Sequence, residues 1–481
     1  MKHLALNPYL PSFEYVPDGE PRIFGNRLYI YGSHDRFDGS DFCVNDYVGW
    51  SAPLDDLGNW HCEGIIYRAT QDPRNSKGKM HMCAADCVQG LDGRYYLYYQ
   101  LHLLQCTSVA VSDSPSGPFE YYGTVQHPDG TPWGEKKGDS FAFDPGILID
   151  DDRRVFLYVG FAPTGILKTV FKLRGNNLSG SVCLELGQDM KTVIGREKPV
   201  VPGPKLSKGT EYAGHSFYEA SSIRKINGKY YYVYSSELSH ELCYAVSDRP
   251  DGDFRYGGTL ISIGDIGYQG RTEANNYTGN THGGMAEING QWYIFYHRQT
   301  NKQKCSRQGC AERLTILPDG SIPQSETTSC GLNDGPLPAR GIYSAHIACN
   351  LSSREGTFAY LRAREKDKKR IHPYFTQIGA DRENNGNQYV ANVTDGAWVG
   401  FKYFVFDGSE KTICVHARSG ATGTFAVYTD QWHTKIAEIG IDPLPGYRKF
   451  SAALTVPTGV YALFFLYHGT GSFDFVSFEI E

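Results

Sequence analysis

Aromatic strands with the same flanking pattern recur five times in the first two thirds of the chain. Each copy has a Gly, Asn or Asp turn, then a polar residue, then an alternating aromatic strand. The copies are FGNRLYIYGSHD from Phe24, LDGRYYLYYQ from Leu91, DDRRVFLYVG from Asp151, INGKYYYVYSS from Ile226 and INGQWYIFYHR from Ile288. Their strands begin 60 to 75 residues apart, at Leu28, Tyr95, Val155, Tyr230 and Trp292. Such a long period with strand signals indicates a repeat of several strands.

A second strand follows the first in three of these repeats. An apolar run ends in Ser, and a Pro- or Asp-rich turn and an aromatic residue come next, in the segments that start at Tyr47, Thr107 and Cys243. The third repeat lacks this copy and carries FKLRGNNLSG in its place. Helical periodicity is weak throughout. The pattern therefore predicts a five-bladed β-propeller with about four strands in each blade, and an irregular array of β-sandwiches is the alternative.

The composition changes near Ser321, where a segment rich in Ser, Pro and Gly indicates a connection between domains. After Ile342, a charged run from Arg362 is expected at a solvated turn or edge. Short alternating strands follow, with turns 8 to 14 residues apart, and predict a β-sandwich. We therefore expect an all-β chain with the propeller in residues 1–322, a linker in 323–341 and a jelly-roll-like β-sandwich in 342–481.

Composition narrows the classes of partner and compartment. The 481 residues include 40% hydrophobic and 21% charged residues, which is ordinary for a soluble protein. A net charge of −6 and the lack of an apolar run of membrane-spanning length give no reason to expect nucleic acid or a membrane as partner. The start, MKHLALNPYLPSF, lacks the pattern of a signal peptide, and the 12 Cys are scattered. We expect a cytoplasmic protein with reduced thiols rather than a metal at Cys83 and Cys87, although a secreted chain trimmed of its signal peptide would look the same.

An ionisable residue precedes each of the five aromatic strands at nearly the same distance. Counting back 9 to 11 residues from each strand start gives Asp18, Asp86, Asp144, Glu219 and His282. In a propeller this position lies on the innermost strand, so radial repetition brings all five side chains to the central axis. Several carboxylates around one cavity are electrostatically costly, which favours a functional origin over a structural one.

Two kinds of chemistry fit such a cluster. In glycoside hydrolysis one carboxyl group is kept protonated and another ionised. A divalent cation would also bind carboxylates gathered at one point. The aromatic content of 14%, with 34 Tyr, favours a sugar ligand, because sugar rings stack on exposed aromatic side chains.

The segments around these residues resemble glycoside hydrolase family 43, a family of five-bladed inverting arabinofuranosidases and xylosidases. The opening NPYLPSFEYVPDGEPRIFGNRLYIYGSHD is similar to the family's first blade and implies that Asp18 is the general base. FAFDPGILIDDDRRVFLY implies that Asp144 orients the acid and modulates its pKa, and FYEASSIRKINGKYYYVYSS implies that Glu219 is the general acid. Gly19 after the base and Ala84-Ala85-Asp86 in the second blade depart from the family's usual residues, which leaves the substrate open.

The resemblance implies an inverting enzyme that removes terminal α-L-arabinofuranosyl residues from arabinoxylan or another plant cell-wall saccharide. A β-xylosidase, or an enzyme with both activities, is the close alternative, and a non-catalytic sugar-binding propeller is a further one. Asp86, His282 and Arg298 are expected to bind substrate. No cofactor is expected to be required, but His282 could hold a structural calcium ion at the propeller axis.

The sequence can also be compared with two other protein families. Related five-bladed fructan hydrolases carry NDPNG-like, RDP and EC motifs, whereas the corresponding residues here are PDGEP, FDP and EA, so that class is excluded. The last 137 or so residues, about 345 to 481, resemble carbohydrate-binding module family 6. In that domain Tyr374, Trp398 and Trp432 could stack on sugar, although aromatic residues of a sandwich more often belong to its core.

Overall fold

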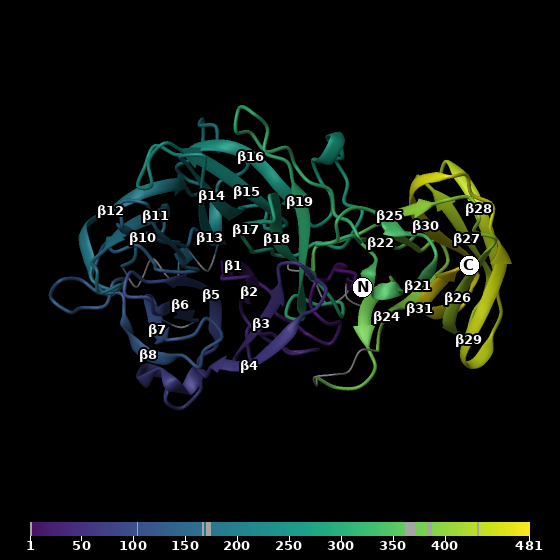
Figure 1. Cartoon of the computed structure of the whole chain (residues 1–481), viewed down its shortest axis with the longest axis horizontal. Coiled ribbons are helices and arrows are strands. Elements are labelled where there is room, and N and C mark those ends of the chain that lie inside the picture. Colours follow the sequence, from purple (N-terminus) through teal and green to yellow (C-terminus); the bar gives the residue numbers. More distant parts are fainter. Residues whose placement is uncertain are drawn as a thin grey trace.

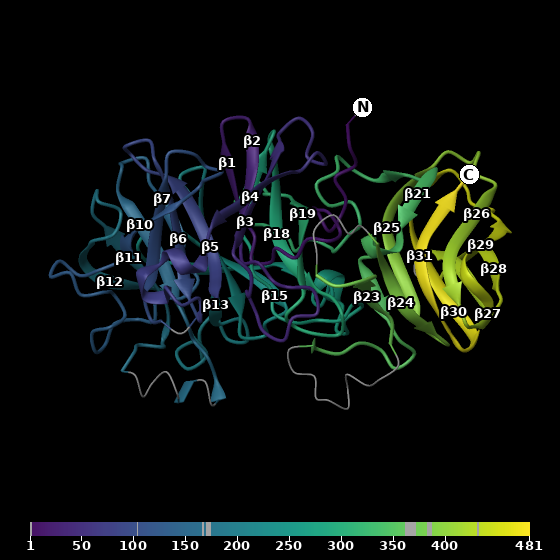
Figure 2. The same cartoon turned by 90° about the horizontal axis from the view of Figure 1, so that it is seen from below.

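The computed structural model of the chain describes residues 2–102, 104–165, 168–169, 175–360, 372–381, 387–430 and 432–481. It has two parts that lie side by side along the long axis of the molecule, and the amino terminus lies near their junction (Figures 1 and 2). The charged run from Arg362 and the start of FKLRGNNLSG lie outside the described residues.

The first part is a propeller of antiparallel sheets, as predicted. Four sheets have four strands each. They are formed by β1 (Glu20–Phe24), β2 (Arg27–Tyr31), β3 (Tyr47–Pro53) and β4 (His61–Tyr67); β5 (Met82–Gln89), β6 (Tyr95–Leu101), β7 (Thr107–Ser112) and β8 (Glu120–Thr124); β9 (Gly146–Ile149), β10 (Val155–Gly160), β11 (Gly180–Leu186) and β12 (Val193–Pro202); and β13 (Phe217–Ile226), β14 (Lys229–Ser236), β15 (Glu241–Ser247) and β16 (Arg255–Ser262).

The fifth blade has three strands in the described part of the chain, β17 (Met285–Ile288), β18 (Gln291–Gln299) and β19 (Arg307–Leu314). The prediction of about four strands in every blade is therefore wrong for this blade. The chain that follows β19 leaves the sheet and packs on the outside of the fourth blade, where the Ile322 N–H donates to the hydroxyl of Tyr244 and the Ser325 N–H donates to the carbonyl of Leu260.

The first strands of the blades surround one axis. Strand β1 contacts β5, β5 contacts β9, β9 contacts β13, β13 contacts β17, and β17 returns to β1 (Figure 1). This closed ring confirms the five-bladed propeller. Residues at the start of each first strand therefore face one another at one end of the axis.

Alternation of side chains explains why the second strands are so rich in tyrosine. In β14, Tyr230, Tyr232 and Tyr234 point to the third blade and join a core with Phe156 and Tyr158 of β10. The residues between them, Tyr231 and Val233, point to the fifth blade and pack with Ile294 and Tyr296. Because each blade is covered on both faces by its neighbours, these strands bury large side chains on both faces.

The second part is a sandwich of two six-stranded sheets, which confirms the expected all-β class. One sheet holds β20 (Leu337–Pro338), β22 (Asn350–Ser352), β25 (Trp398–Phe406), β27 (Thr422–Thr429), β28 (Thr434–Ile441) and β30 (Gly459–Thr470). The other holds β21 (Gly341–Ser344), β23 (Tyr374–Gln377), β24 (Gln388–Thr394), β26 (Thr412–Ser419), β29 (Leu444–Ala453) and β31 (Ser472–Ile480). A core of aromatic and aliphatic side chains fills the space between the sheets.

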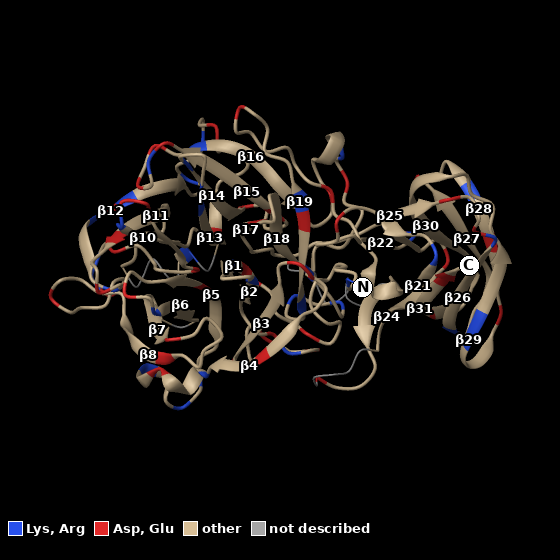
Figure 3. Ribbon diagram, in the orientation of Figure 1, with Lys and Arg blue, Asp and Glu red and all other residues tan. Residues whose placement is uncertain are grey.

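Short 3₁₀ turns complete the regular structure: η1 (Ala69–Gln71), η2 (Pro73–Asn75), η3 (Tyr268–Gly270) and η4 (Ala345–Ile347). Acidic and basic residues are interspersed over both parts (Figure 3). Within the described residues, none of the helical segments has the length and apolar character needed to cross a membrane.

Candidate active site

The three predicted catalytic carboxylates lie at the ends of first strands. Asp18 precedes β1, Asp144 precedes β9, and Glu219 lies near the start of β13. The backbones of Asp18 and Asp144 are left-handed, with φ of 57° and 48°. Ala220, which follows Glu219, also has a positive φ of 71°, and the pairing of β13 with β14 shifts on both sides of Glu219. Left-handed backbone at non-glycine residues costs about 1 kcal/mol or more each and is concentrated at functional sites.

Contacts between blades bring these residues together. The Nδ1 atom of His282 lies 3.5 Å from Oδ2 of Asp144 and 4.0 Å from Oδ1 of Asp18. The Ala220 N–H donates to Oδ2 of Asp144 over 3.2 Å, which joins Asp144 to the strand that carries Glu219. Four of the five residues predicted to meet at the axis thus form one group, and the fifth, Asp86, lies in a separate layer described below.

Asp18 is held as an ionised carboxylate. Its Oδ1 accepts a hydrogen bond of 2.9 Å from Arg307, and its Oδ2 accepts one of 2.6 Å from the Ser33 hydroxyl. Burial would raise the pKa of Asp18, but the positive charge of Arg307, with smaller contributions from neighbouring histidines and Ser33, lowers that pKa to about 2. A buried carboxylate that stays charged and has a fixed orientation is suited to take a proton from water.

The two histidines beside Asp18 are neutral. Burial lowers the pKa of His282 to about 4 and that of His297 to about 3, and Arg307 lowers both further. At neutral pH they therefore add hydrogen-bonding capacity rather than positive charge, and Arg307 supplies the ionic stabilisation of Asp18. The Asp18 N–H donates to Nδ1 of His297 over 3.2 Å, which fixes the backbone that presents the carboxylate.

The pKa values of Asp144 and Glu219, in contrast to that of Asp18, are raised. Burial raises the pKa of Glu219, and the nearby charge of Asp18 raises it further, to about 8. Burial also raises the pKa of Asp144 well above its usual range, and the charge of Glu219 adds to this effect. Such a coupled pair holds a proton at neutral pH. Asp144 accepts the Ala220 N–H, which favours its ionised form, so we place the proton on Glu219.

A second layer of charge closes the axis below these carboxylates. Arg22 donates to both oxygens of Asp86, over 2.8 and 2.5 Å, and Arg224 donates to Glu20 over 2.6 Å. All four side chains come from the first strands of the first, second and fourth blades. At Gly284 of the fifth blade, an added Cβ would lie 2.3 Å from the Glu20 carboxylate, so only glycine leaves room for this layer.

Two of the residues expected to bind substrate have other partners. Both oxygens of Asp86 are used within the protein, by Arg22 and by the N–H groups of Cys87 and Ile147. Arg298 points to the sandwich, where its guanidinium donates to the carbonyls of His346 and Ala348 and lies 3.8 Å from the ring centre of Phe375. Substrate binding by Asp86 and Arg298 stays a prediction that this geometry does not support, whereas His282 lies among the catalytic carboxylates.

The sequence reasoning missed the residues that hold the base. Arg307, at the start of β19, contacts Asp18 and also donates to both oxygens of Asp35, over 2.8 and 3.0 Å. Ser33 and Asp35 follow the second strand of the first blade, and His297 lies on β18. The common offset from the aromatic strands identifies residues of the first strands only. The motif GSHD after β2 and the basic residue that opens β19 were the available signals.

A calcium ion at the axis fits this residue set poorly. Calcium takes six to eight oxygen ligands, usually carboxylates, carbonyls and waters. Around His282 the carboxylates of Asp18 and Asp144 belong to the candidate catalytic group, and the layer below already holds two guanidinium groups, which supply the positive charge that an ion would bring. No step of the chemistry is therefore assigned to a metal at this position.

Comparison with known proteins agrees with this site. A protein of Thermoclostridium stercorarium named xylosidase/arabinosidase is 46% identical over 100% of this chain and 99% of its own length. An arabinoxylan arabinofuranohydrolase of Bacillus subtilis is 25% identical over 99% of this chain and 92% of its own length. The solved structure of a family 43 arabinoxylan arabinofuranohydrolase from Bacillus subtilis, with cellotetraose, covers 98% of this chain and 97% of its own, with a TM-score of 0.53 at 22% identity, and supports the two-part fold.

The family description "Glycosyl hydrolases family 43" matches residues 24–322, which is more than half of the chain and includes Asp144, Glu219, His282 and Arg307. The matched range spans nearly the whole propeller. The similarity to the Thermoclostridium stercorarium protein also covers the sandwich. The chain is a glycosidase of the xylosidase/arabinosidase kind and belongs to glycoside hydrolase family 43.

Proposed function

We propose that this enzyme removes terminal α-L-arabinofuranosyl residues from arabinoxylan or its fragments, with inversion at the anomeric carbon. The observation that carries the proposal is the opposite protonation of two carboxyl groups at one site. The pKa of Asp18 is lowered to about 2 and that of Glu219 is raised to about 8. Between these values one group is a base and the other an acid, as two-carboxylate hydrolysis requires.

In the proposed reaction, Asp18 accepts a proton from water while the water oxygen forms a bond to the anomeric carbon. Glu219 gives its proton to the glycosidic oxygen as the bond from that oxygen to the anomeric carbon breaks. Asp144 orients Glu219 through the Ala220 backbone, while burial and the charge of Asp18 keep the pKa of Glu219 high. The products are the free sugar and an alcohol. We expect the two catalytic carboxyl groups to be separated by about 6.5–9.5 Å, which leaves room for the water.

The closed axis supports removal of terminal residues rather than cleavage within a chain. Glu20, Arg22, Asp86 and Arg224 fill the axis below the catalytic group, so a polysaccharide cannot pass through the propeller. Phe143 and Tyr218 are partly exposed and each precedes a catalytic carboxylate in the sequence. We propose that one sugar ring enters the pocket and that these aromatic rings contact its faces.

The arabinofuranosyl assignment rests on the relatives that match along both parts. Two of these relatives, from Paenibacillus polymyxa and Bacillus subtilis, are named arabinoxylan arabinofuranohydrolase, and each aligns with 99% of this chain. A β-xylosidase activity is the second candidate, because the 46% identical relative carries both activities in its name. Arabinofuranose and xylopyranose present similar hydroxyl geometry, so one pocket can accept both.

A direct assay separates these candidates. Initial rates on 4-nitrophenyl α-L-arabinofuranoside and on 4-nitrophenyl β-D-xylopyranoside give the ratio of kcat/KM for the two sugars, and proton NMR at early times identifies the first-formed anomer. We expect the arabinofuranoside to be preferred and the anomeric configuration to be inverted. A first-formed product with retained configuration would contradict the mechanism, and a preference for the xyloside would favour the second candidate.

We propose that hydrolysis requires no cofactor, because the three carboxyl groups already provide the acid and the base. A family 43 β-xylosidase/α-arabinofuranosidase from a compost microbial metagenome, which is 24% identical to this chain, has been solved in a calcium-free form. The test is dialysis against EDTA followed by the aryl-arabinofuranoside assay with and without added Ca²⁺. We expect unchanged kcat in both, and a loss that Ca²⁺ restores would contradict the proposal.

For the sandwich we propose a bracing role, with sugar binding as the alternative that its resemblance to carbohydrate-binding module family 6 implies. Trp398 and Trp432 lie 5.7 Å apart at right angles, and Trp432 is 37% exposed. Tyr374 lies at the junction with the propeller, under the ammonium of Lys302. Binding of arabinoxylan to Trp432→Ala, compared with wild type by affinity electrophoresis, separates the two roles.

A further inference from the structure

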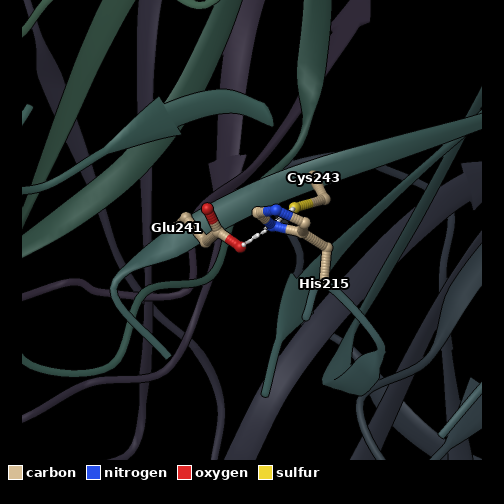
Figure 4. A group of neighbouring side chains, drawn as sticks. All are labelled: His215, Glu241 and Cys243. Atoms are coloured by element: carbon tan, nitrogen blue, oxygen red, sulfur yellow. Dashed lines mark hydrogen bonds and ion pairs between the residues drawn. The ribbon is translucent and has the colours of Figure 1, made fainter. Parts of the chain in front are cut away.

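Three potential metal ligands meet in the fourth blade, away from the catalytic carboxylates. They are Nδ1 of His215, Oε1 of Glu241 and Sγ of Cys243, and all lie within 4.8 Å of one another (Figure 4). The imidazole to carboxylate distance is 2.7 Å, the thiol to carboxylate distance is 3.3 Å, and the thiol to imidazole distance is 3.9 Å. We propose that these side chains bind a thiophilic divalent cation, with zinc as the ion they fit best.

The distances between the three ligand atoms suit a zinc ion. Zinc lies about 2.0–2.2 Å from nitrogen and oxygen ligands and about 2.3 Å from sulfur, so ligands of a tetrahedral site are about 3.3–3.6 Å apart. The thiol to carboxylate distance already has this value. Binding would lengthen the contact between imidazole and carboxylate and shorten that between thiol and imidazole, each by less than 1 Å, which side-chain rotation can supply.

The backbone presents the ligands together. Glu241 and Cys243 are two residues apart on β15, so their side chains share one face of the strand. His215 comes from the segment before β13, and its ring stacks on Tyr256 of β16 with 5.3 Å between ring centres. The ligands thus join two segments that are distant in the sequence.

Neighbouring hydroxyl groups hold the carboxylate in place. Ser236 donates to Oε1 of Glu241 over 2.6 Å, and Thr259 donates to Oε2 over 3.1 Å. Such outer hydrogen bonds orient the ligands of metal sites. Glu241 and Cys243 are buried, whereas the His215 side chain is 36% exposed, so an ion can enter beside the imidazole and keep a water molecule as a fourth ligand.

Charge and ligand chemistry select the ion. A glutamate and a cysteine thiolate would balance the two positive charges of Zn²⁺, with His215 neutral. Thiolate and imidazole ligands select zinc over calcium and magnesium, which prefer oxygen. On binding, the Cys243 thiol proton passes to water as the bond between sulfur and zinc forms, and the imidazole binds through Nδ1 with its proton on Nε2.

The competing account is a hydrogen-bond cluster that stabilises buried Glu241 without any metal. His215→Gln separates the two, because a glutamine amide can donate to Glu241 but is a poor zinc ligand. Cys243→Ser removes the thiolate. The matched control is Cys183→Ser, because Cys183 is also buried and also lies on the third strand of its blade, β11, in the third blade.

The experiment measures uptake of Zn²⁺ and of Co²⁺ by the full chain after EDTA treatment. We expect one zinc per chain by mass spectrometry, a near-ultraviolet thiolate-to-cobalt absorption band, and a rise in Tm with added Zn²⁺, in wild type and in Cys183→Ser alike. His215→Gln and Cys243→Ser should lose at least about a hundredfold in zinc affinity. Absence of stoichiometric uptake in wild type, or uptake and a cobalt band that persist in His215→Gln, would overturn the proposal.

Discussion

The catalytic chemistry depends on how two carboxyl groups of the same site are made different. Asp18 accepts hydrogen bonds from a guanidinium and a hydroxyl group, whereas none of the described residues donates such a hydrogen bond to the Glu219 carboxyl group. Glu219 instead is buried near the negative charge of Asp18, which raises its pKa further. Under the same burial, Asp18 therefore has the low pKa of the proposed base and Glu219 the high pKa of the proposed acid, because the charges that dominate their surroundings have opposite signs.

We predict different substrate dependence for the acid and base variants. Glu219→Ala should lose about a hundredfold or more in kcat on arabinoxylan oligosaccharides, because the leaving oxygen needs a proton. It should keep more activity on aryl arabinofuranosides, whose stable leaving group needs little protonation. Asp18→Ala should be equally impaired on both substrates. Steady-state kinetics of both variants, with circular dichroism as the check on folding, tests these roles, and equal losses on the two substrates in Glu219→Ala would contradict them.

The pH dependence of kcat/KM provides a second residue-scale prediction. Activity requires Asp18 ionised and Glu219 protonated, so it should fall as the pH rises through about 8 and should persist to low pH. Loss of Arg307 raises the pKa of Asp18 and also that of Glu219, because the guanidinium lowers both. Both limbs of the profile should therefore move to higher pH in Arg307→Gln.

The matched control for that profile is Arg307→Lys, which keeps the positive charge but loses the paired contact with Asp35. Its limbs should lie closer to those of the wild type. An acidic limb that stays in place in Arg307→Gln would show that Arg307 does not set the pKa of the base.

At the scale of single strands, the sequence predicted the positions of the aromatic strands well. Those expected to begin at Leu28, Tyr95, Val155, Tyr230 and Trp292 are β2, β6, β10, β14 and β18, each within one residue of the expected start. The reason is physical: strands covered on both faces need long runs of large side chains, which few other elements carry. The strand β28 has a much weaker pattern, because TKIAEIGI carries charged residues on its exposed face and has no aromatic residue.

The partners of the base could not be predicted in the same way. Arg298 and Arg307 lie on adjacent strands of the fifth blade, and nothing in the local pattern tells which one faces the axis. The structure turns Arg298 to the carbonyls of the sandwich and Arg307 to Asp18. That choice depends on the docking of the second domain and on the loop that carries Asp35, which involve residues about 50 to 270 positions apart.

The glycine that directly precedes the first strand of the fifth blade provides the element-scale prediction. A Cβ at residue 284 would lie 2.3 Å from Glu20 Oε2 and 2.4 Å from Ser222 Oγ, so Gly284→Ala should overpack the charged layer. We expect a loss of about 1–3 kcal/mol in the free energy of unfolding. Gly252→Ala is the control, because an added Cβ there meets nothing within 4 Å. Urea denaturation of both variants measures this difference. Equal stability of the two variants would show that the charged layer can accommodate the added methyl group.

At the scale of the whole molecule, the two parts are joined by buried polar groups. Lys402 of β25 lies 3.3 Å from Asp265 of the propeller and 2.7 Å from Glu326 of the segment that follows the propeller. Gln388 of β24 forms hydrogen bonds with Tyr15, which precedes the first blade, and with Gln308 of β19 in the fifth blade. Removal of the sandwich would expose these groups together, so a truncated propeller cannot separate a bracing role from a catalytic one.

A single substitution at the junction is a cleaner test of bracing. Lys402→Met removes the cation but keeps the apolar stem, and it leaves the fully buried Asp265 without its ionic partner. Breaking a buried ion pair in this way costs about 3–5 kcal/mol, so the free energy of unfolding should fall by that order. The active-site contacts of Asp18 and Glu219 do not involve Lys402, so kcat on an aryl arabinofuranoside should stay within about twofold of wild type while the protein is folded. Lys435→Ala, which breaks an exposed pair with Glu438 on the sandwich, should change stability little. If Lys402→Met is folded and yet loses more than about a hundredfold in kcat, the sandwich acts on the chemistry itself and the bracing role is wrong.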